Sequence, residues 1–470
     1  MLLRTTPESV GISSSAISRF IDSLAGLDSV HSFMLLRHGK VAAELWNAPY
    51  RPDVPHELFS LSKSFTSAAI GFARQEGKLQ LDDRIAEFFP EKLPEDPDPR
   101  FLRMTVRHLL TMSSGHDRCA LCYMINRHEP DFVKSFFRSP LVYEPGSRFV
   151  YNSGATYMLS AIIRRLTGEN LTEYLRPRLF APLGFGEREW EKDPQGTELG
   201  GWGFRLTTEE IARFAQLLLD GGRWAGRQIL PADYLELATS FQIDNSMNTQ
   251  PDWQVGYGFQ FWRCRHNAYR GDGAFGQYAL VMPDQDAALA VTSGMRNMQS
   301  VLDRVWEILL PAMQDAPLPE AAVEQQALRA KIAGAAFPVL PGPGRETRWE
   351  TVEFEPNTIG AETLQLESTA SSCRLILRRN GGEEILEAGF GRRIDNHTRF
   401  GCSCLRRMAA SAAWRDDETL EVLAHLYETP YRLRFLLRRE NGVLTLERNA
   451  NLLFFGLEEW PLLCGRLSRA

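Results

Sequence analysis

The sequence predicts an α+β fold, in which an antiparallel sheet flanked by helices is followed by a separate all-β domain. Apolar residues recur at helical spacing at 12–27 and 300–311, whereas strand-like runs lie at 30–46 and 255–292. Helices at both ends and strands that return late fit an α+β or α/β unit built on an antiparallel sheet. Beyond residue 346 short strands alternate with turns, and this pattern predicts the second domain.

Local signals define the elements of the first domain. Residues 12–27 open with serine cap candidates and place apolar side chains on one helical face, and 30–46 reads as a hairpin around a turn at 37–40. Residues 61–76 are expected to form a helix that Gly77 ends. The other expected elements are helices at 105–112, 154–167, 207–220 and 300–311 and strands at 255–264 and 277–292.

Changes in composition divide the chain into two domains. Residues 1–313 form the first domain, and 314–345, rich in proline and framing a short helix-capable stretch, are expected to be a linker. Residues 346–470 contain Asn-Gly hairpin signals at 380–381 and 441–442. We expect this second domain to be a small sandwich or barrel.

Composition and charge exclude several classes of protein. Of the 470 residues, 44% are hydrophobic and 24% charged, and the net charge is −6. This balance is typical of a soluble globular protein and argues against a general nucleic-acid or anionic-membrane binder. Neither an export signal nor a run long enough to span a bilayer is recognisable, so we interpret the chain as cytoplasmic. The oligomeric state cannot be inferred from the sequence.

The seven cysteines are scattered and odd in number, which fits reduced thiols. One cluster, made of His116, Cys119, Cys122 and His128, has spacing that could hold zinc or form a redox pair. The segment lacks the strand followed by a helix in which redox motifs lie, and it lacks the second half of a common zinc pattern. We therefore expect neither a metal nor a cofactor, and His116 is expected to be a structural histidine near the cleft.

Ser60 and Lys63 are the first candidate catalytic residues. Residues three apart share a helical face, so Ser60 and Lys63 lie within reach of one another at the start of the expected helix. A serine hydroxyl needs a base to become a nucleophile, and a buried lysine with a lowered pKa can supply one. Only seven of the 53 basic residues are lysines, so few other amines could serve.

A second candidate motif begins at Tyr151, which stands directly before the amphipathic helix expected at 154–167. A tyrosine near a cationic lysine can have its pKa depressed and can then transfer protons. A lone tyrosine in this setting more often packs and hydrogen-bonds locally, so Tyr151 is a candidate catalytic residue only when it is considered together with the other motifs.

Several motifs in order resemble the serine β-lactamase and penicillin-binding-protein superfamily, in particular its class C β-lactamase-like esterases, D-amino-acid peptidases and amide hydrolases. The resemblance runs over roughly residues 5–313. It is carried by FSLSKSFTSAAIGFARQEGKLQLDD, TVRHLLTMSSG, EPGSRFVYNSGATYMLSAIIRRLTG, RPRLFAPLGF, GGWGFRLTTEEIARFAQLLLDGG and GDGAFGQYALVMPDQDAALAVTSG. It implies an antiparallel sheet flanked by helices, with an all-helical region that carries the tyrosine motif.

The resemblance also implies a mechanism. Ser60 would be the acylated nucleophile, Lys63 would help to remove its proton, and Tyr151 would act as general base and acid toward the leaving group and water. The oxyanion hole would combine the backbone N–H groups of Ser60 and Gln277. Trp202 lies in a segment that borders the family's site, and we expect it to contact substrate. Trp253, Tyr257, Phe259, Phe261 and Trp262 are further candidates for pocket walls.

Two departures from the family's pattern bear on the substrate. Ser153 stands where the second motif commonly has asparagine; its hydroxyl can still donate and accept hydrogen bonds but reaches less far than an amide, and Ser153 is a candidate substrate contact. The third motif, Lys-Thr-Gly or His-x-Gly, is absent; Phe275 and Gly276 align there, and Asp272 is taken as the only nearby ionisable group. Without a cation to anchor a substrate carboxylate, efficient β-lactamase activity is not expected. Asp272 is expected either to bind an amine-bearing or neutral ester substrate or to be a plain turn residue.

We therefore expect a serine hydrolase that cleaves a small ester or amide through an acyl-enzyme. The alternative is a catalytically weak or inactive binding or regulatory protein that keeps the fold, because two of the three motifs are altered and a β domain is appended. Whether the substrate is an ester, an amide or a D-amino-acid peptide is left open by the sequence.

Overall fold

The structure is a computed structural model that describes the whole chain except residues 1, 28, 127–128, 453–458 and 468–470. It divides into two compact units, each described here by itself. The first comprises Met1–Leu45 and Pro55–Gly334, and the second comprises Trp46–Val54 and Ala335–Ala470.

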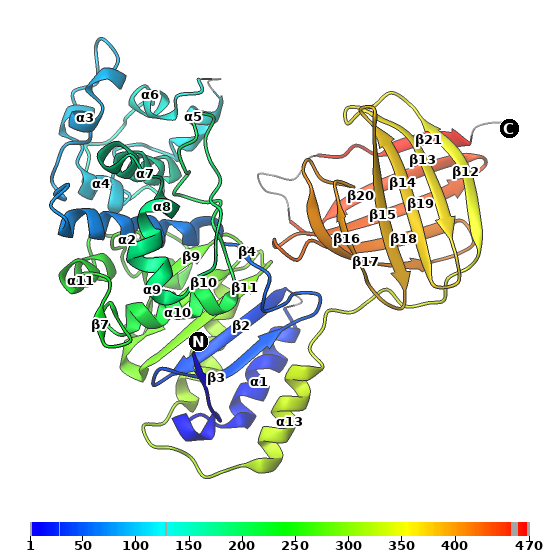
Figure 1. Cartoon of the computed structure of the whole chain (residues 1–470), viewed down its shortest axis with the longest axis horizontal. Coiled ribbons are helices and arrows are strands. Elements are labelled where there is room, and N and C mark those ends of the chain that lie inside the picture. The colour runs from blue at the N-terminus through cyan, green and yellow to red at the C-terminus, as the bar shows by residue number, and fades with distance from the viewer. Residues whose placement is uncertain (1, 28, 127–128, 453–458, 468–470) are drawn as a thin grey trace. The chain divides into compact units, whose positions relative to one another are not determined.

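A seven-stranded sheet forms the centre of the first unit (Figure 1). Its order is β1-β3-β2-β11-β10-β9-β8, with β1 and β3 parallel and the pairs β2–β11, β11–β10, β10–β9 and β9–β8 antiparallel. The strands are β1 (Leu3–Arg4), β2 (Val30–Arg37), β3 (Lys40–Trp46), β8 (Trp262–Arg263), β9 (Tyr269–Gly273), β10 (Gln277–Met282) and β11 (Ala287–Ser293). The antiparallel sheet predicted from the sequence is confirmed.

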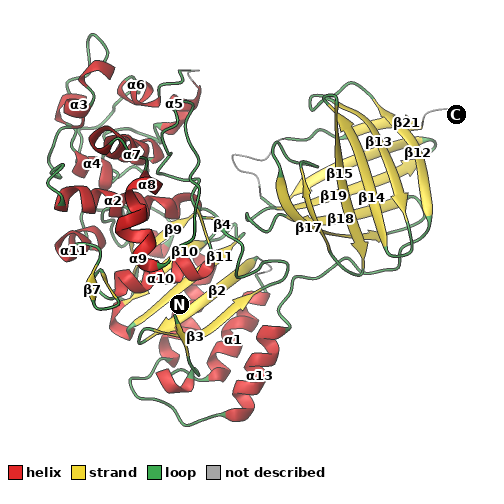
Figure 2. Cartoon of the chain, viewed as in Figure 1, coloured by secondary structure: helices red, strands yellow, loops and turns green. Residues whose placement is uncertain are grey.

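Helices cover both faces of this sheet, which explains why all eight residues of β2 are buried. Successive side chains of a strand point to opposite faces. Phe33 packs edge-to-face on Phe20 of α1 (Ser14–Ala25), at 5.5 Å between ring centroids, whereas the Ser32 hydroxyl lies 2.7 Å from that of Thr208 on α10 (Thr208–Leu219). Figure 2 shows the helices, in red, around the strands.

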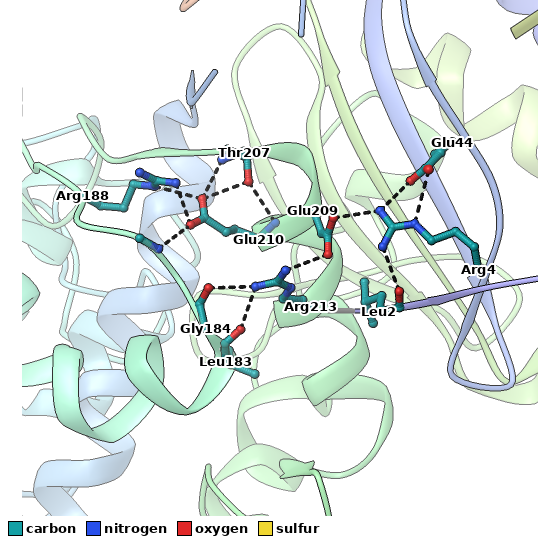
Figure 3. A network of polar contacts seen from close by, with 11 residues as sticks. Leu2, Arg4, Glu44, Leu183, Gly184, Arg188, Thr207, Glu209, Glu210 and Arg213 are labelled. Carbon is teal, nitrogen blue, oxygen red and sulfur yellow. Dashed lines mark hydrogen bonds and ion pairs between the residues drawn. The ribbon is translucent and has the colours of Figure 1, made fainter. Parts of the chain in front are cut away.

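A polar network fixes α10 to the edge of the sheet (Figure 3). The guanidinium of Arg4 on β1 donates to Glu44 of β3 and to Glu209 of α10, and Glu209 in turn accepts from Arg213. Arg213 also donates to the backbone carbonyls of Leu183 and Gly184. Through its contact with Arg4, Glu209 thus joins α10 to β1.

The remaining helices of the first unit include the predicted all-helical region. The helix expected at 61–76 is α2 (Ser62–Gln75), and that at 154–167 is α7 (Ser153–Thr167); the two pack against each other. The other helices are α3 (Ile85–Phe88), α4 (Val106–Leu110), α5 (Leu121–Asn126), α6 (Phe132–Phe137), α8 (Leu171–Leu175), α9 (Ala181–Leu183), α11 (Ala232–Thr239), α12 (Gln299–Arg304) and α13 (Ala322–Ala333). Short strand pairs are β4 (His56–Glu57) with β5 (Arg205–Leu206), and β6 (Arg223–Trp224) with β7 (Arg227–Gln228).

Two segments differ from expectation. The strand expected at 255–264 is only the two-residue β8, because the chain before it forms isolated bridges, such as the one between Tyr257 and Ile243. Residues 314–345, expected to be a linker, include α13, which packs on α1; Lys331 pairs there with Asp22. Proline and alanine around this helix gave the segment the composition of a linker.

The second unit is a ten-stranded sheet, nine strands of which close into a barrel, one of the two architectures expected. Its order is β15-β14-β13-β12-β21-β20-β19-β18-β17-β16, and a parallel pairing of β15 with β17 closes it. The strands are β12 (Thr347–Phe354), β13 (Ala361–Ser368), β14 (Ser372–Arg379), β15 (Gly382–Phe390), β16 (Ile394–Thr398), β17 (Arg406–Trp414), β18 (Thr419–His425), β19 (Arg432–Glu440), β20 (Val443–Ala450) and β21 (Leu463–Leu467). Alternate leucines fill the interior, as β14 shows with Leu375 and Leu377 fully buried.

The segment Trp46–Val54 belongs to this second unit although it follows β3 in the chain. Ala48 pairs with Ala336, and Tyr50 and Val54 pack in a cluster with Phe337, Ala409 and Tyr427. Nothing in the sequence pattern indicated this pairing, because it joins segments nearly 300 residues apart.

Within the described ranges, none of the helices is both long and apolar enough to cross a membrane.

Candidate active site

Ser60 lies in a one-turn 3₁₀ helix, Phe59–Leu61, that leads directly into α2. One turn later, Lys63 points back at it, and the Lys63 ammonium lies 3.0 Å from the Ser60 hydroxyl oxygen. Ser60 is partly exposed, whereas Lys63 is 1% exposed. The expected contact of nucleophile and base is therefore present, with the serine open to solvent and the lysine shielded from it.

Lys63 has three hydrogen-bond acceptors, which hold its amine in place. It donates to Ser60 Oγ at 3.0 Å, to Ser153 Oγ at 3.0 Å and to the carbonyl of Gly201 at 2.7 Å. Burial lowers the pKa of Lys63 to about 7, and the charges of Cys119 and Asp272 oppose only part of that effect. Near neutral pH a substantial fraction of Lys63 is thus neutral and able to accept a proton from Ser60.

Tyr151 lies beside both residues. The Lys63 ammonium is 5.0 Å from the centroid of the Tyr151 ring, which stacks on Trp262 at 5.5 Å and 21°. Burial raises the pKa of Tyr151 above its ordinary value, the charge of Asp272 raises it further, and a hydrogen bond with Ser60 lowers it by less. Tyr151 is therefore a neutral phenol at neutral pH, contrary to the depressed pKa considered from the sequence, because the protein packed around it and the charge of Asp272 both disfavour the phenolate.

Asn152, which the sequence analysis overlooked, builds the start of α7. Its amide oxygen accepts the backbone N–H groups of Ala120, Gly154 and Ala155, and its amide nitrogen donates to Ser114. An asparagine at the N-cap position satisfies free N–H groups of a helix. Asn152 points into the protein, whereas its neighbours Tyr151 and Ser153 both lie next to Lys63, and Ser153 accepts a hydrogen bond from it.

The first residues of β10 approach the catalytic turn. Both β9 and β10 contact Phe59–Leu61, and a Cβ on Gly273 would lie 2.0 Å from the carbonyl oxygen of Leu58. Gln277 pairs with Gly273 in register, and its side chain is fixed by the backbone of Ala274 and Ser293. This close approach brings the chain at Gln277 near Ser60, as the expected oxyanion hole requires.

Two phenylalanines next to the contact between β9 and the turn that holds Ser60 have strained backbones. Phe59 has φ +48° and Phe275 has φ +68°, in the left-handed region that side chains other than glycine rarely adopt. Their rings meet edge-to-face at 5.4 Å between centroids. Gly276 follows with φ +89° and would clash with the Ser293 hydroxyl if it carried a Cβ. Phe275 and Gly276 thus shape the turn next to the nucleophile, and Phe275 is partly exposed there.

Trp202 directly follows Gly201, whose carbonyl accepts from Lys63. The side chain of Trp202 is partly exposed, and its own carbonyl accepts the indole N–H of Trp190. Trp202 thus lies in the segment that contacts Lys63, and its expected contact with substrate stays a prediction.

Asp272 is not the only ionisable group of the third-motif region, because Arg270 lies two residues before it on β9. Both side chains are buried, and the Arg270 Nε donates to Asp272 Oδ2 at 3.0 Å. Asp272 is 6% exposed, so it is neither an open subsite for a substrate amine nor a plain turn residue. The pair is not recognisable from the family's third motif, because that motif has a lysine or a histidine and Arg270 is neither.

The sequence of residues 29–311 matches the Beta-lactamase family. This span is more than half of the chain. The chain belongs to the Beta-lactamase family.

Relatives of this Beta-lactamase family chain include hydrolases of amides and esters. It is 26% identical over 284 residues to a 6-aminohexanoate-dimer hydrolase of Paenarthrobacter ureafaciens, a match that covers 56% of this chain and 72% of that protein. It is 29% identical over 151 residues to the esterase EstB of Burkholderia gladioli, covering 29% of this chain and 38% of the esterase, so that match spans well under half of the relative.

Solved structures with the same fold include proteins that match both units. An octameric penicillin-binding protein homologue from Pyrococcus abyssi covers 96% of this chain and 99% of its own, with a TM-score of 0.52 and 15% identity. The crystal structure of SurE covers 91% of this chain and 98% of its own, with a TM-score of 0.52 and 18% identity. The β-lactamase-like fold with an appended C-terminal barrel is thus shown.

In this Beta-lactamase family chain, His116 is a structural residue. The Ser139 hydroxyl donates to the carbonyl of Phe136, so it accepts from His116 Nε2, and His116 Nδ1 then accepts from the Ser114 hydroxyl. Ser114 in turn accepts from Asn152. A neutral His116 therefore holds the network that positions the start of α7.

We expect acid to weaken this network. Burial lowers the pKa of His116 to about 4, so the folded protein binds its proton less readily than the unfolded chain, whose histidine titrates near 6.5. The stability contributed by neutral His116 is full above pH 6.5 and is lost as the pH falls toward 4, by up to roughly 3 kcal/mol. Urea unfolding at several pH values measures this loss of stability. In His116→Gln the free energy of unfolding should depend less on pH between 6.5 and about 4. A variant whose pH dependence equals that of the wild type would contradict the role given to neutral His116.

The histidine and cysteine cluster does not form a metal site among the residues that the structure describes. Both ring nitrogens of His116 already have partners, and His128 lies outside the described residues. Cys119 is instead part of the site, where its sulfur accepts the backbone N–H of Ser153 at 3.2 Å. Cys119 had been considered only for metal or redox chemistry, because its nearness to Ser153 depends on tertiary packing.

Proposed function

We propose that this chain is a serine hydrolase that cleaves a small ester or amide through an acyl-enzyme on Ser60. The observation that carries the proposal is the arrangement of Lys63, a buried amine that contacts Ser60 and Ser153 at 3.0 Å and has a pKa lowered to about 7. An ion-paired structural lysine would have a carboxylate partner, whereas the acceptors of Lys63 among the described residues are neutral oxygens. The amide hydrolase and esterase relatives support both substrate classes.

Acylation in this proposal begins with proton transfer from Ser60 to neutral Lys63. The Ser60 oxygen attacks the substrate carbonyl, and the resulting oxyanion is stabilised by the backbone N–H groups of Ser60 and Gln277. The bond to the leaving group breaks as Tyr151, a neutral phenol, donates its proton to that group. Tyr151 then recovers a proton from protonated Lys63, which restores both residues.

Deacylation repeats these steps with water. A water molecule gives its proton to neutral Lys63 as it attacks the acyl carbonyl, and the Ser60 oxygen leaves and takes that proton from Lys63. The products are a carboxylic acid and the free enzyme. Tyr151 thus serves as the acid and Lys63 as the base, a sharper division of roles than the sequence allowed.

Labelling with a fluorophosphonate tests this proposal against the alternative of an inactive binding protein. We expect the intact mass to increase by one phosphonyl group at Ser60, and hydrolysis of p-nitrophenyl acetate to be lost in Ser60→Ala. Ser62→Ala is the matched control, because Ser62 is a buried neighbour that does not contact Lys63 in the hydrogen-bond pattern. Folded wild-type protein that neither labels nor turns over a panel of activated esters and amides would contradict the proposal and favour the binding protein.

A further inference from the structure

A buried ion pair on β9 lies behind the catalytic residues. Arg270 is 0% exposed and Asp272 is 6% exposed. The Arg270 Nε donates to Asp272 Oδ2 at 3.0 Å, and Nη2 lies 2.9 Å from the same oxygen. Each of these two charges depends on the other for its burial.

Aromatic side chains connect the pair to Tyr151. The Arg270 guanidinium lies 4.0 Å from the ring centroid of Trp253 and 5.7 Å from that of Trp262. Trp262 in turn stacks on the Tyr151 ring. Arg270, held in place by Asp272, therefore supports the surface on which the catalytic phenol rests.

The remaining contacts of Arg270 anchor the pair on its far side. Arg270 Nη1 donates to the carbonyl of Asp252 at 2.7 Å and approaches the Cys264 sulfur at 2.8 Å. Both partners are buried. Arg270 is thus held away from the open side of the site, where a substrate carboxylate would have to bind.

The charge of Asp272 reaches the catalytic residues. It favours the protonated forms of Lys63 and of Tyr151, while Arg270 acts in the opposite sense on Tyr151. The other titratable groups that face this cluster are Cys119, Tyr257, Cys264, Asp252 and Tyr278. Of these groups Asp272 is the one carboxylate that acts on both Lys63 and Tyr151 among the described residues.

We propose that the Arg270–Asp272 pair is a positioning element, in which Asp272 holds Arg270 against Trp262 behind Tyr151 and sets the charge that Lys63 experiences, without binding substrate. This inference rests on the proposed function of Ser60, Lys63 and Tyr151. It replaces the expectation that Asp272 recognises an amine-bearing substrate. It also means that the pair offers no free charge to the substrate, so the groups next to the scissile bond are expected to be uncharged.

Titration of Lys63 tests the inference without depending on turnover. With only seven lysines, selective ¹³C labelling gives a simple NMR spectrum in which the Lys63 signal is assigned by its loss in Lys63→Met. Asp272→Asn removes the negative charge and leaves Arg270 unopposed, so the Lys63 titration should move to lower pH by at least about 0.5 unit. The acid limb of kcat/KM for p-nitrophenyl acetate should move with it, and KM for a p-nitrophenyl ester with a terminal amine should change no more than KM for the neutral ester.

Asp131→Asn is the matched control, because Asp131 is also a buried, ion-paired aspartate but its partner is Lys92. Its Lys63 titration should be unchanged. If Asp272→Asn does not fold, the neutral double variant Arg270→Gln/Asp272→Asn replaces it, with a smaller shift in the same direction expected. An unmoved Lys63 titration in the folded variant, or a loss confined to KM for the amine ester, would overturn the inference. A shifted titration in a protein that never labels at Ser60 would instead overturn the proposed function alone.

Discussion

Lys63→Met is expected to lower kcat/KM for a small activated ester by about 10³-fold, within the range that general acid–base catalysis contributes. Methionine nearly fills the volume of the lysine side chain but cannot accept the Ser60 proton or donate to Ser153 and Gly201. In the wild type, the same reasoning gives an acid limb near pH 7, where Lys63 becomes protonated and activity falls. Stopped-flow or steady-state hydrolysis of p-nitrophenyl acetate between pH 5 and 9 measures both effects.

The control for this prediction is Lys40→Met, which alters an exposed lysine at the turn between β2 and β3. Its activity and pH profile should equal those of the wild type. A Lys63→Met variant that keeps more than about a tenth of the activity, with its acid limb unmoved, would show that another group activates Ser60.

Gly273→Ala is expected to have the largest effect on the architecture of the site. The added Cβ would lie 2.0 Å from the backbone carbonyl oxygen of Leu58 and 3.2 Å from the backbone nitrogen of Leu61, and neither is the flexible end of a side chain. Strand β9 and the catalytic turn must therefore separate. We expect a loss of about 1–3 kcal/mol in the free energy of unfolding, typical of overpacking, together with loss of Ser60 labelling.

Urea unfolding and fluorophosphonate labelling measure these two effects. Gly26→Ala is the matched control, because a Cβ there meets its nearest neighbour at 3.7 Å, an ordinary contact, and the backbone of Gly26 is in the right-handed region. Gly273→Ala with wild-type stability and wild-type labelling would mean that β9 does not set the position of the catalytic turn.

The parts of the site that could be predicted from the sequence are contacts between residues that lie close together in the chain. Ser60 and Lys63 are one helical turn apart, so their contact follows from the helix alone, and Ser153 follows from its place after Tyr151 at the start of α7. The fold class was predictable for the same reason, since helical and strand periodicities are properties of short segments.

The features that were missed all depend on packing between distant segments. Arg270 and Asp272 are recognisable as a pair only once alternate residues of β9 are known to share a buried face. The backbone contact of Cys119 with Ser153 joins two loops, and the conclusion that Tyr151 stays a phenol required the aromatic side chains packed around it. A pKa depends on burial, and burial is a property of the complete fold.

The assignment of Trp46–Val54 to the second unit has a consequence for how the chain can be divided. The polypeptide passes between the two units three times, at 45–46, 54–55 and 334–335, so no single cut releases either one. A protein that ended at Gly334 would contain the whole catalytic sheet but would leave Tyr50 and Val54 without Phe337, Ala409 and Tyr427. During synthesis, the segment that leads into the catalytic turn cannot reach its final partners until the last third of the chain has been made.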